Sequence, residues 1–106
     1  MKLGIILNTN DPEVVWNCFR CANEALKNNH SVKIFLLGTG VYAEGLKDDK
    51  YPLLQGAIQK FLKNNGSISV CGTCLTARGK QSAYAVSTMD DMLKIVEESD
   101  KVLTFG

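Results

Sequence analysis

Cys71 and Cys74, separated by Gly72 and Thr73, are the side chains of this sequence best suited to chemistry. They follow the short apolar run 68–70, which is typical of the end of a strand, and the glycine lets the backbone turn sharply there. A thiol at a strand-to-helix turn lies near unpaired backbone N–H groups and the positive end of a helix dipole. Both favour the thiolate, which is the reactive form of cysteine. The pattern therefore predicts chemistry at sulfur.

The residues after the cysteines predict a short helix that carries a positive charge. Residues 75–78 suit one helical turn, and Gly79 suits the left-handed conformation that ends many helices. Arg78 then lies within reach of the thiols, where its guanidinium could stabilise a thiolate or an incoming anion. A solvated surface charge is an equal alternative for this arginine.

A second Cys-x-x-Cys pair, Cys18 and Cys21, lies in a different part of the chain. Together the two pairs offer the four thiols of a zinc site. Their long separation in sequence argues against such a site, and so does the helical pattern around the first pair. Cys18 falls on the apolar face of that helix, where cysteine acts as a small hydrophobe. We expect no metal and no cofactor.

The elements that must position these cysteines alternate between strands and helices. Apolar runs rich in β-branched residues predict strands, and apolar recurrences at three- and four-residue spacing predict helices. The alternation predicts an α/β fold, with a parallel sheet covered by helices on both faces, in a single domain over residues 1–106. The predicted strands are 3–7, 31–37, 67–71 and 101–105, and the predicted helices begin at Pro12, at Pro52 and after Thr88.

Other stretches carry weaker signals. Residues 41–51 predict a loop with a short helix, and residues 80–87 show no clear period. Trp16 lies off the apolar stripe of its helix, which suggests a subunit interface or partial burial against a loop. The last helix is predicted to bury a stripe made of Met89, Met92, Leu93 and Val96.

Polar or glycine-rich segments follow three of the predicted strands. In a parallel sheet, ligands and reactive groups collect at the carboxyl ends of the strands, so neighbouring strands would bring these segments into one pocket with Cys71 at its wall. The segment 38–40 lacks the glycine pattern and the lysine of a phosphate-binding loop, which favours an ordinary turn. The expected lining residues are Asn8, Thr9, Asn10, Gly38, Thr39, Gly40, Gly72 and Thr73.

Charge and composition argue against several kinds of partner. The 106 residues include 12 Lys and Arg, 11 Asp and Glu, and no basic block, so we do not expect nucleic acid as a partner. No apolar run is as long as a membrane span, and residues 1–7 are too short for a signal peptide. We expect a cytoplasmic location without membrane binding, where the four cysteines stay reduced.

The cysteine turn and the end of the chain resemble the DsrE/DsrF-like family, most closely its YchN type. The pattern of the first two strands and the long first helix agrees with the same group, so the likeness spans nearly the whole chain. The residues that carry it are Cys71-Gly72-Thr73-Cys74 with Ala77-Arg78-Gly79, then Ser87-Thr88-Met89-Asp90, and finally Asp100-Lys101-Val102-Leu103-Thr104-Phe105.

This resemblance implies a three-layer α/β/α sandwich of about four to five mainly parallel strands, assembled as homotrimers or homohexamers. It also implies a sulfur relay, in which a cysteine carries sulfur as a persulfide between donor and acceptor proteins. The carrier of the relay branch precedes its Arg-Gly pair by the spacing that Cys71 has here, so the likeness assigns the acceptor role to Cys71. Cys74 would resolve the persulfide or stay a spectator. Such a protein transfers sulfur rather than turning over a small-molecule substrate.

Two other functions stay open. A dithiol oxidoreductase of the thioredoxin type also places Cys-x-x-Cys after a strand. However, the only prolines, Pro12 and Pro52, stand at predicted helix starts, so neither is placed to face the dithiol as in that family. The other alternative is an oligomeric module that binds a small ligand and whose cysteines are structural.

Overall fold

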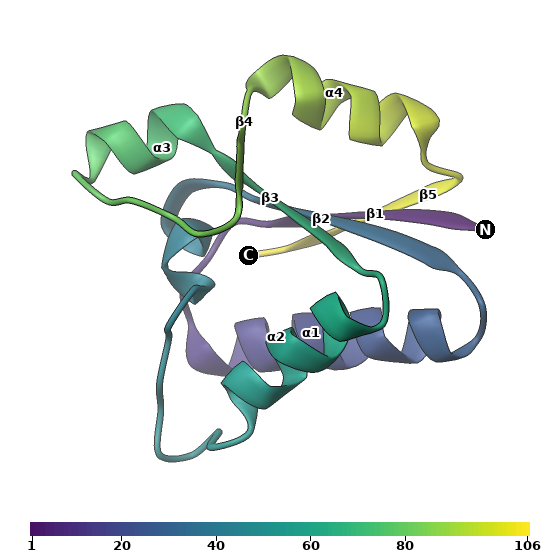
Figure 1. Ribbon diagram of the computed structural model, residues 1–106, viewed down its shortest axis with the longest axis horizontal. Coiled ribbons are helices and arrows are strands. Elements are labelled where there is room, and N and C mark those ends of the chain that lie inside the picture. Colours follow the sequence, from purple (N-terminus) through teal and green to yellow (C-terminus); the bar gives the residue numbers. More distant parts are fainter.

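The computed structural model describes residues 1–106 and contains one five-stranded sheet in which every pairing is parallel (Figure 1). The strand order is β4-β3-β2-β1-β5, so the first three strands of the chain are neighbours. This arrangement confirms the predicted α/β fold with a parallel sheet. The strands are β1 (Lys2–Leu7), β2 (Ser31–Leu36), β3 (Ser67–Cys71), β4 (Ala85–Ser87) and β5 (Lys101–Phe105).

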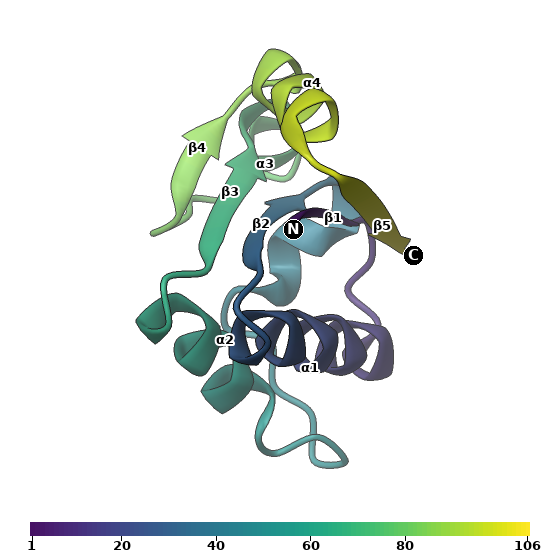
Figure 2. The same ribbon diagram turned by 90° about the vertical axis from the view of Figure 1, so that its right-hand side faces the viewer.

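Helices cover both faces of the sheet, with α1 and α2 on one side and α3 and α4 on the other (Figure 2). A 3₁₀ helix, η1, follows β2. None of the helices is long and apolar enough to cross a membrane. The helices are α1 (Pro12–Lys27), η1 (Gly38–Ala43), α2 (Leu54–Lys63), α3 (Gly72–Ala77) and α4 (Met89–Glu98).

Side-chain caps begin the two helices for which the sequence predicts them. The Asp11 carboxylate accepts the N–H of Val14 at 3.0 Å, and the Thr88 hydroxyl accepts the N–H of Asp91 at 3.2 Å. Each bond satisfies a donor that the first turn of a helix leaves free. These caps fix where the chain leaves the sheet and enters α1 and α4.

The boundaries differ from the predicted ones at three places. Residues 52–53 form a turn before α2 rather than its first residues, and the segment after β2 is helical from Gly38 onwards. The short strand β4 lies inside residues 80–87, where no period was visible. It is only three residues long and pairs with β3 at the edge of the sheet. A segment of that length is too short to show a two-residue alternation.

The two faces of the sheet are packed to very different extents. The main core contains 18 buried residues and joins α1, α2 and η1, together with Leu75 of α3, to one face of the sheet. On the other face only four buried residues form a cluster, namely Ile6, Phe35, Cys71 and Ile95. Cys71 therefore lies on the side of the sheet that the chain itself covers least, and Cys74 packs against both clusters.

The predicted buried stripe of the last helix is wrong. Ile95 is the buried residue of α4 and Met92 is half-buried, whereas Met89, Leu93 and Val96 are exposed. This short helix has two overlapping apolar rows, and a periodic pattern does not say which row faces the sheet. The exposed row leaves an apolar strip on the surface of α4.

Candidate functional site

The carboxyl ends of β1, β2 and β3 lie at one edge of the sheet, and the segments that follow them are in contact. The N–H of Leu37 donates to the carbonyl of Leu7 at 2.9 Å. Gly38 has a positive φ of 56°, and an added Cβ there would collide with the Asn8 amide. Gly40 likewise packs against the carbonyl of Leu7 so closely that no side chain would fit. Glycine is needed at both positions because the first two segments approach so closely.

Cys71 ends β3 and begins α3 at the same time. Its Sγ accepts the N–H of Cys74 at 3.3 Å, which makes the thiol the cap of the short helix. Only 3 % of the residue is exposed, because Ile6, Phe35 and Ile95 surround it in the smaller core cluster. Cys71 thus lies below the surface rather than in the wall of an open pocket.

Cys74 lies in the first turn of α3 and is half-buried. Its Sγ accepts the backbone N–H of Gly38 at 3.3 Å, so the second segment of the site contributes a donor directly to this sulfur. Of the two cysteines, Cys74 combines access from solvent with a donor that comes from another strand end.

Burial changes the expected reactivity of Cys71. Its loss of solvation raises the pKa of the thiol above the ordinary value of 9.0, and the neighbouring Cys74 thiol raises it further. Hydrogen bonds from the N–H groups of Cys74 and Thr73 lower the pKa, but they offset only part of this increase. The turn geometry alone predicted an easily formed thiolate at Cys71; the structure opposes this, because desolvation disfavours the charged form.

Arg78 contacts the cysteine turn through the backbone. Its guanidinium Nη1 donates to the carbonyl of Cys74 at 3.2 Å, one helical turn earlier. Gly79 follows with a φ of 58°, the left-handed conformation that the sequence predicts for it. Arg78 therefore stabilises the end of α3, and its guanidinium bonds to this carbonyl rather than to a thiol.

The remaining predicted lining residues divide into two groups. Gly72 lies against Val86 and Ser87 of the edge strand. Thr73, between the two cysteines, and Thr39, directly after Gly38, are both exposed. The Thr9 hydroxyl instead accepts the N–H of Asp11 at 3.1 Å, so it supports the start of α1. Asn8 and Asn10 are exposed, and Asn8 also lies against Gly38.

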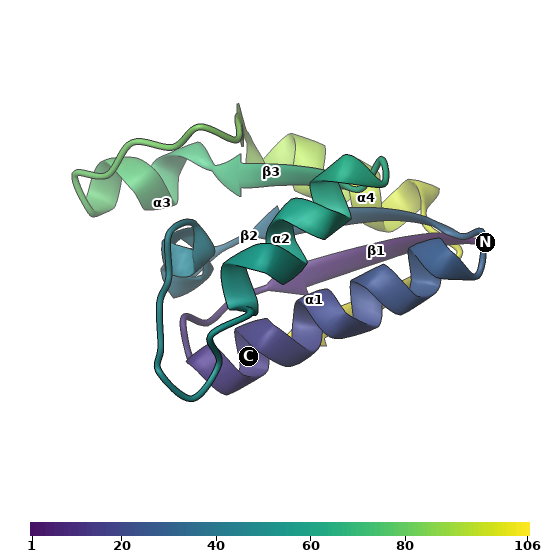
Figure 3. The same cartoon turned by 60° about the horizontal axis from the view of Figure 1, so that its bottom comes forward.

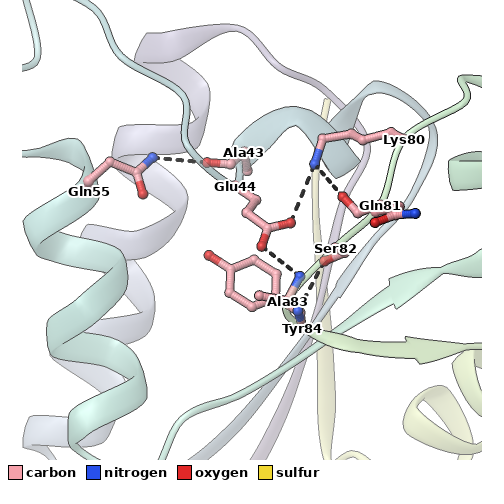
Figure 4. Close-up of polar contacts among 8 residues, drawn as sticks. All are labelled: Ala43, Glu44, Gln55, Lys80, Gln81, Ser82, Ala83 and Tyr84. Atoms are coloured by element: carbon pink, nitrogen blue, oxygen red, sulfur yellow. Dashed lines mark hydrogen bonds and ion pairs between the residues drawn. The ribbon is translucent and has the colours of Figure 1, made fainter.

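Glu44 is a residue of this region that the sequence analysis missed (Figure 4). Its carboxylate accepts the N–H of Ala83 at 2.8 Å and lies 3.4 Å from the Lys80 ammonium. Burial alone would raise the pKa of Glu44, but hydrogen bonds from Ala83, Ser82 and Lys80 and the lysine charge hold it below the ordinary 4.5. Glu44 thereby fastens the segment after α3 to the end of η1. No local pattern predicts this contact, since its partners lie 36 and 39 positions away.

The first cysteine pair has a different environment. Cys18 is completely buried in the main core, and this burial, with the nearby Cys21, raises the pKa of its thiol to about 12. Cys21 is exposed on the outer side of α1. All four cysteines are free, and no three His, Cys, Asp or Glu side chains converge where they could hold a metal ion.

The fold matches a solved structure closely. The crystal structure of the YchN protein from E. coli superposes with a TM-score of 0.83, over 99 % of this chain and 100 % of that one, at 24 % sequence identity. This likeness shows that the two proteins share a fold. It agrees with the five-stranded parallel sheet and the two layers of helices described above.

Sequence comparison gives the family. The chain is 34 % identical over 117 residues to the uncharacterized protein MJ0989 of Methanocaldococcus jannaschii, covering 99 % of this chain and 100 % of that protein. It is 30 % identical over 100 residues to the uncharacterized protein MK0008 of Methanopyrus kandleri, covering 88 % and 83 %. The sequence profile of the DsrE/DsrF-like family matches residues 1–105. The chain therefore belongs to the DsrE/DsrF-like family.

Proposed function

We propose that this protein carries sulfur as a persulfide on the Cys71–Cys74 turn and acts within a sulfur relay. Membership of the DsrE/DsrF-like family supports a function related to sulfur relay. The observation that carries the finer proposal is the pairing of two free thiols at one strand end, with the Gly38 N–H donating to Cys74 Sγ. Residues 1–106 act as one domain in this proposal, and the protein transfers sulfur without turning over a small-molecule substrate.

Cys71 is the sulfur-holding thiol, and Cys74 is the thiol that meets the donor. The Cys74 thiolate attacks the outer sulfur of a donor persulfide, so a new S–S bond forms on Cys74 and the donor leaves as a thiolate. Cys71 then attacks that same outer sulfur and takes it over. Its proton passes to Cys74, which returns as a thiol. Neither step needs an oxidant or a reductant.

Burial supports this division of roles. A persulfide on Cys71 would be shielded from solvent because only 3 % of that residue is exposed, whereas Cys74 is half-buried. The reactive sulfur would thus be loaded at an accessible position and kept at a protected one. Release to an acceptor protein reverses the two transfers.

Intact-mass spectrometry after incubation with a persulfide donor tests the proposal. We expect the wild-type protein to gain the mass of one sulfur atom, and the variant with both Cys71→Ser and Cys74→Ser to gain none. Cys21→Ser is the matched control, because it removes an exposed thiol outside the turn and should load normally. Equal loading of the double variant, or no loading of the wild type, would overturn the proposal.

Separate variants test the roles of the two cysteines. Cys74→Ser should slow loading, since the donor must then reach a buried sulfur. Cys71→Ser should load at a normal rate but lose its sulfur faster, because the persulfide stays on the half-exposed Cys74. The opposite pattern would make Cys71 the thiol that meets the donor.

The same close pair favours a dithiol redox function as the second candidate. In that function Cys71 and Cys74 close as a disulfide, and both lose a hydrogen to an oxidised partner. Treatment with oxidised glutathione would then remove two hydrogens from the mass of the wild type and none from either single variant. A protein that neither gains sulfur nor loses hydrogen would be a ligand-binding module with structural cysteines.

We also propose that the protein works as a homotrimer or homohexamer in the cytoplasm, with separate donor and acceptor proteins as partners. The exposed apolar row of α4, together with Val102 and Leu103 of the edge strand β5, supports self-association because such residues are costly to leave in water. Sedimentation velocity of the wild type and of Leu93→Glu tests this. We expect a trimer or hexamer that dissociates in the variant, and a wild-type monomer would overturn the proposal.

A further inference from the structure

A groove of about 1140 Å³ runs between α1 and α2 on the outer surface of the molecule. The two helices lie side by side along it, as Figure 3 shows. Trp16 and Arg20 line the α1 side, and Leu53, Gly56 and Lys60 line the α2 side. No residue of the cysteine site takes part, so the groove is independent of the proposed sulfur transfer.

The α2 side of the groove is open at Gly56, which is exposed. Gly56 has nothing within 4 Å of the position that a Cβ would occupy. Beside it, the Asn23 amide donates to the carbonyl of Ala57 at 3.0 Å and links the two helices. The groove is thus a preformed depression between connected helices. At its edges it offers apolar surface, since Leu53 is 67 % exposed and Trp16 is partly exposed.

The groove concentrates positive charge. Four of its side chains are cationic and one, Glu24, is a carboxylate, which gives a local net charge of +3 in a chain whose total is only +1. No carboxylate lies within ion-pair distance of any of the four, because the three ion pairs of the protein involve other lysines. The guanidinium carbon of Arg20 lies over the Trp16 ring, 5.8 Å from the ring centroid. The cationic residues are Arg20, Lys27, Lys60 and Lys63.

We propose that the α1–α2 groove binds an acidic amphipathic helix of a partner protein. The helices that flank it are about 24 Å and 15 Å long, which suits a bound helix of three or four turns. An apolar row on that helix would cover Trp16, Leu53 and the open space at Gly56. Carboxylates on both sides of the row would face the four cationic side chains, none of which has a carboxylate partner within the chain, as in helix-in-groove recognition.

The chain carries one helix of this chemistry itself, but its position argues against a second copy as the occupant. α4 has four carboxylates and one lysine, and it exposes Met89, Leu93 and Val96. However, α4 and the groove lie on opposite faces of the sheet (Figure 2). Seating α4 of one copy in the groove of the next would be a head-to-tail contact between opposite faces, which forms an open assembly unless the rotation between copies closes a ring. A helix from a different protein fills the groove without this consequence.

A designed peptide of about 15 residues tests the proposal, with leucines on one helical face and glutamates elsewhere. The peptide is titrated into the full-length protein at low salt. Trp16 is the only tryptophan, so its emission reports on the groove, and the rate of alkylation of the exposed Cys21 gives a second readout. We expect a saturable change in emission and protection of Cys21. A peptide with lysines in place of the glutamates should produce neither.

Variants of the groove make the test specific. Gly56→Leu fills the open space at this position, and because leucine favours a helix more than glycine, the variant should fold at least as well as wild type. It should bind the peptide at least about tenfold more weakly. Lys60→Glu with Lys63→Glu should weaken binding by about tenfold as well, whereas Lys47→Glu with Lys50→Glu, outside the groove, should leave it unchanged.

Four results would overturn the proposal. One is the absence of any Trp16 response to the acidic peptide in the folded protein. The second is unchanged binding by Gly56→Leu, and the third is equal binding of the lysine peptide. The fourth is self-assembly of the unliganded protein that Gly56→Leu blocks in sedimentation velocity, which would make a second copy the occupant.

Discussion

The two Cys-x-x-Cys pairs of this chain have the same spacing and opposite surroundings. In α1, Cys18 points into the main core and Cys21 into solvent. At the end of β3, Cys71 Sγ accepts the N–H of Cys74, and Cys74 Sγ accepts the N–H of Gly38. One pair is therefore divided between core and surface, and the other is held together by hydrogen bonds to sulfur.

The comparison shows that the element, and not the spacing, decides what a cysteine pair can do. Inside a helix such as α1, each backbone N–H already donates to the carbonyl four residues earlier, so none remains for a thiolate. At a strand-to-helix turn the first N–H groups are free. The turn can therefore direct donors at sulfur, whereas the helix uses its buried cysteine only for packing.

The largest expected effect is the difference in alkylation between the two pairs. The pKa of Cys18 is about 12 against an ordinary 9.0, so near neutral pH its thiolate should be about a thousandfold scarcer than that of an ordinary cysteine. Iodoacetamide followed by peptide mapping should label Cys74 and Cys21 in the native protein. Cys18 should react only after unfolding in guanidinium. Native labelling of Cys18 at the rate of Cys74 would remove the contrast between the pairs.

Serine substitutions should separate packing from capping. Cys18→Ser buries a hydroxyl in the main core and should lower the free energy of unfolding by about 1–3 kcal/mol. Cys71→Ser should cost less than about 1 kcal/mol, because a serine hydroxyl also accepts the N–H of Cys74 as a helix cap. Urea denaturation measures both values, with Cys21→Ser as the neutral control. A larger loss for Cys71→Ser would mean that its thiol is mainly a packing group.

The pH dependence of alkylation should show how burial affects Cys71 in the second pair. Burial raises the pKa of Cys71 above 9.0, so in Cys74→Ser the labelling rate of Cys71 should still be increasing where an ordinary thiol has levelled off. The control is Cys21 in the same sample. A rate for Cys71 that levels off below pH 9.0 would show that the backbone donors outweigh its burial.

Glu44→Gln should have the smallest effect. The effect should be confined to Cys74 and the segment after α3. The lowered pKa of Glu44 means that its contribution to stability is present above the ordinary 4.5 and is lost as pH falls through the lower folded value. Removing the charge should reduce the free energy of unfolding at neutral pH by no more than about 1 kcal/mol. The free energy of unfolding of the variant should also decrease less than that of the wild type as pH falls. It should also speed alkylation of Cys74 by about twofold while leaving Cys21 unchanged, because it loosens the segment after α3. Urea denaturation at several pH values, together with peptide mapping, checks both.

Local patterns were enough to predict most of the elements. The strands containing Leu3–Leu7 and Ser67–Cys71, the cap at Asp11 and the left-handed Gly79 all depend on residues close in sequence. The meeting of three segments at one edge also follows from the sequence, once the strands are parallel and adjacent. The apolar periodicity of α4 did not predict its buried face. The helix has two overlapping apolar rows, and the pattern fits either of them.

The sequence by itself determined the α/β fold, the position of the cysteine turn at a strand end and the likeness to the DsrE/DsrF-like family. Only the tertiary structure decided that Cys71 is buried, that Gly38 donates to Cys74 and that Glu44 fastens the segment after α3. It alone also revealed the cationic groove between α1 and α2. The physical reason is sequence distance: strand, cap and turn preferences act over a few residues, whereas burial and these contacts join residues that only folding brings together.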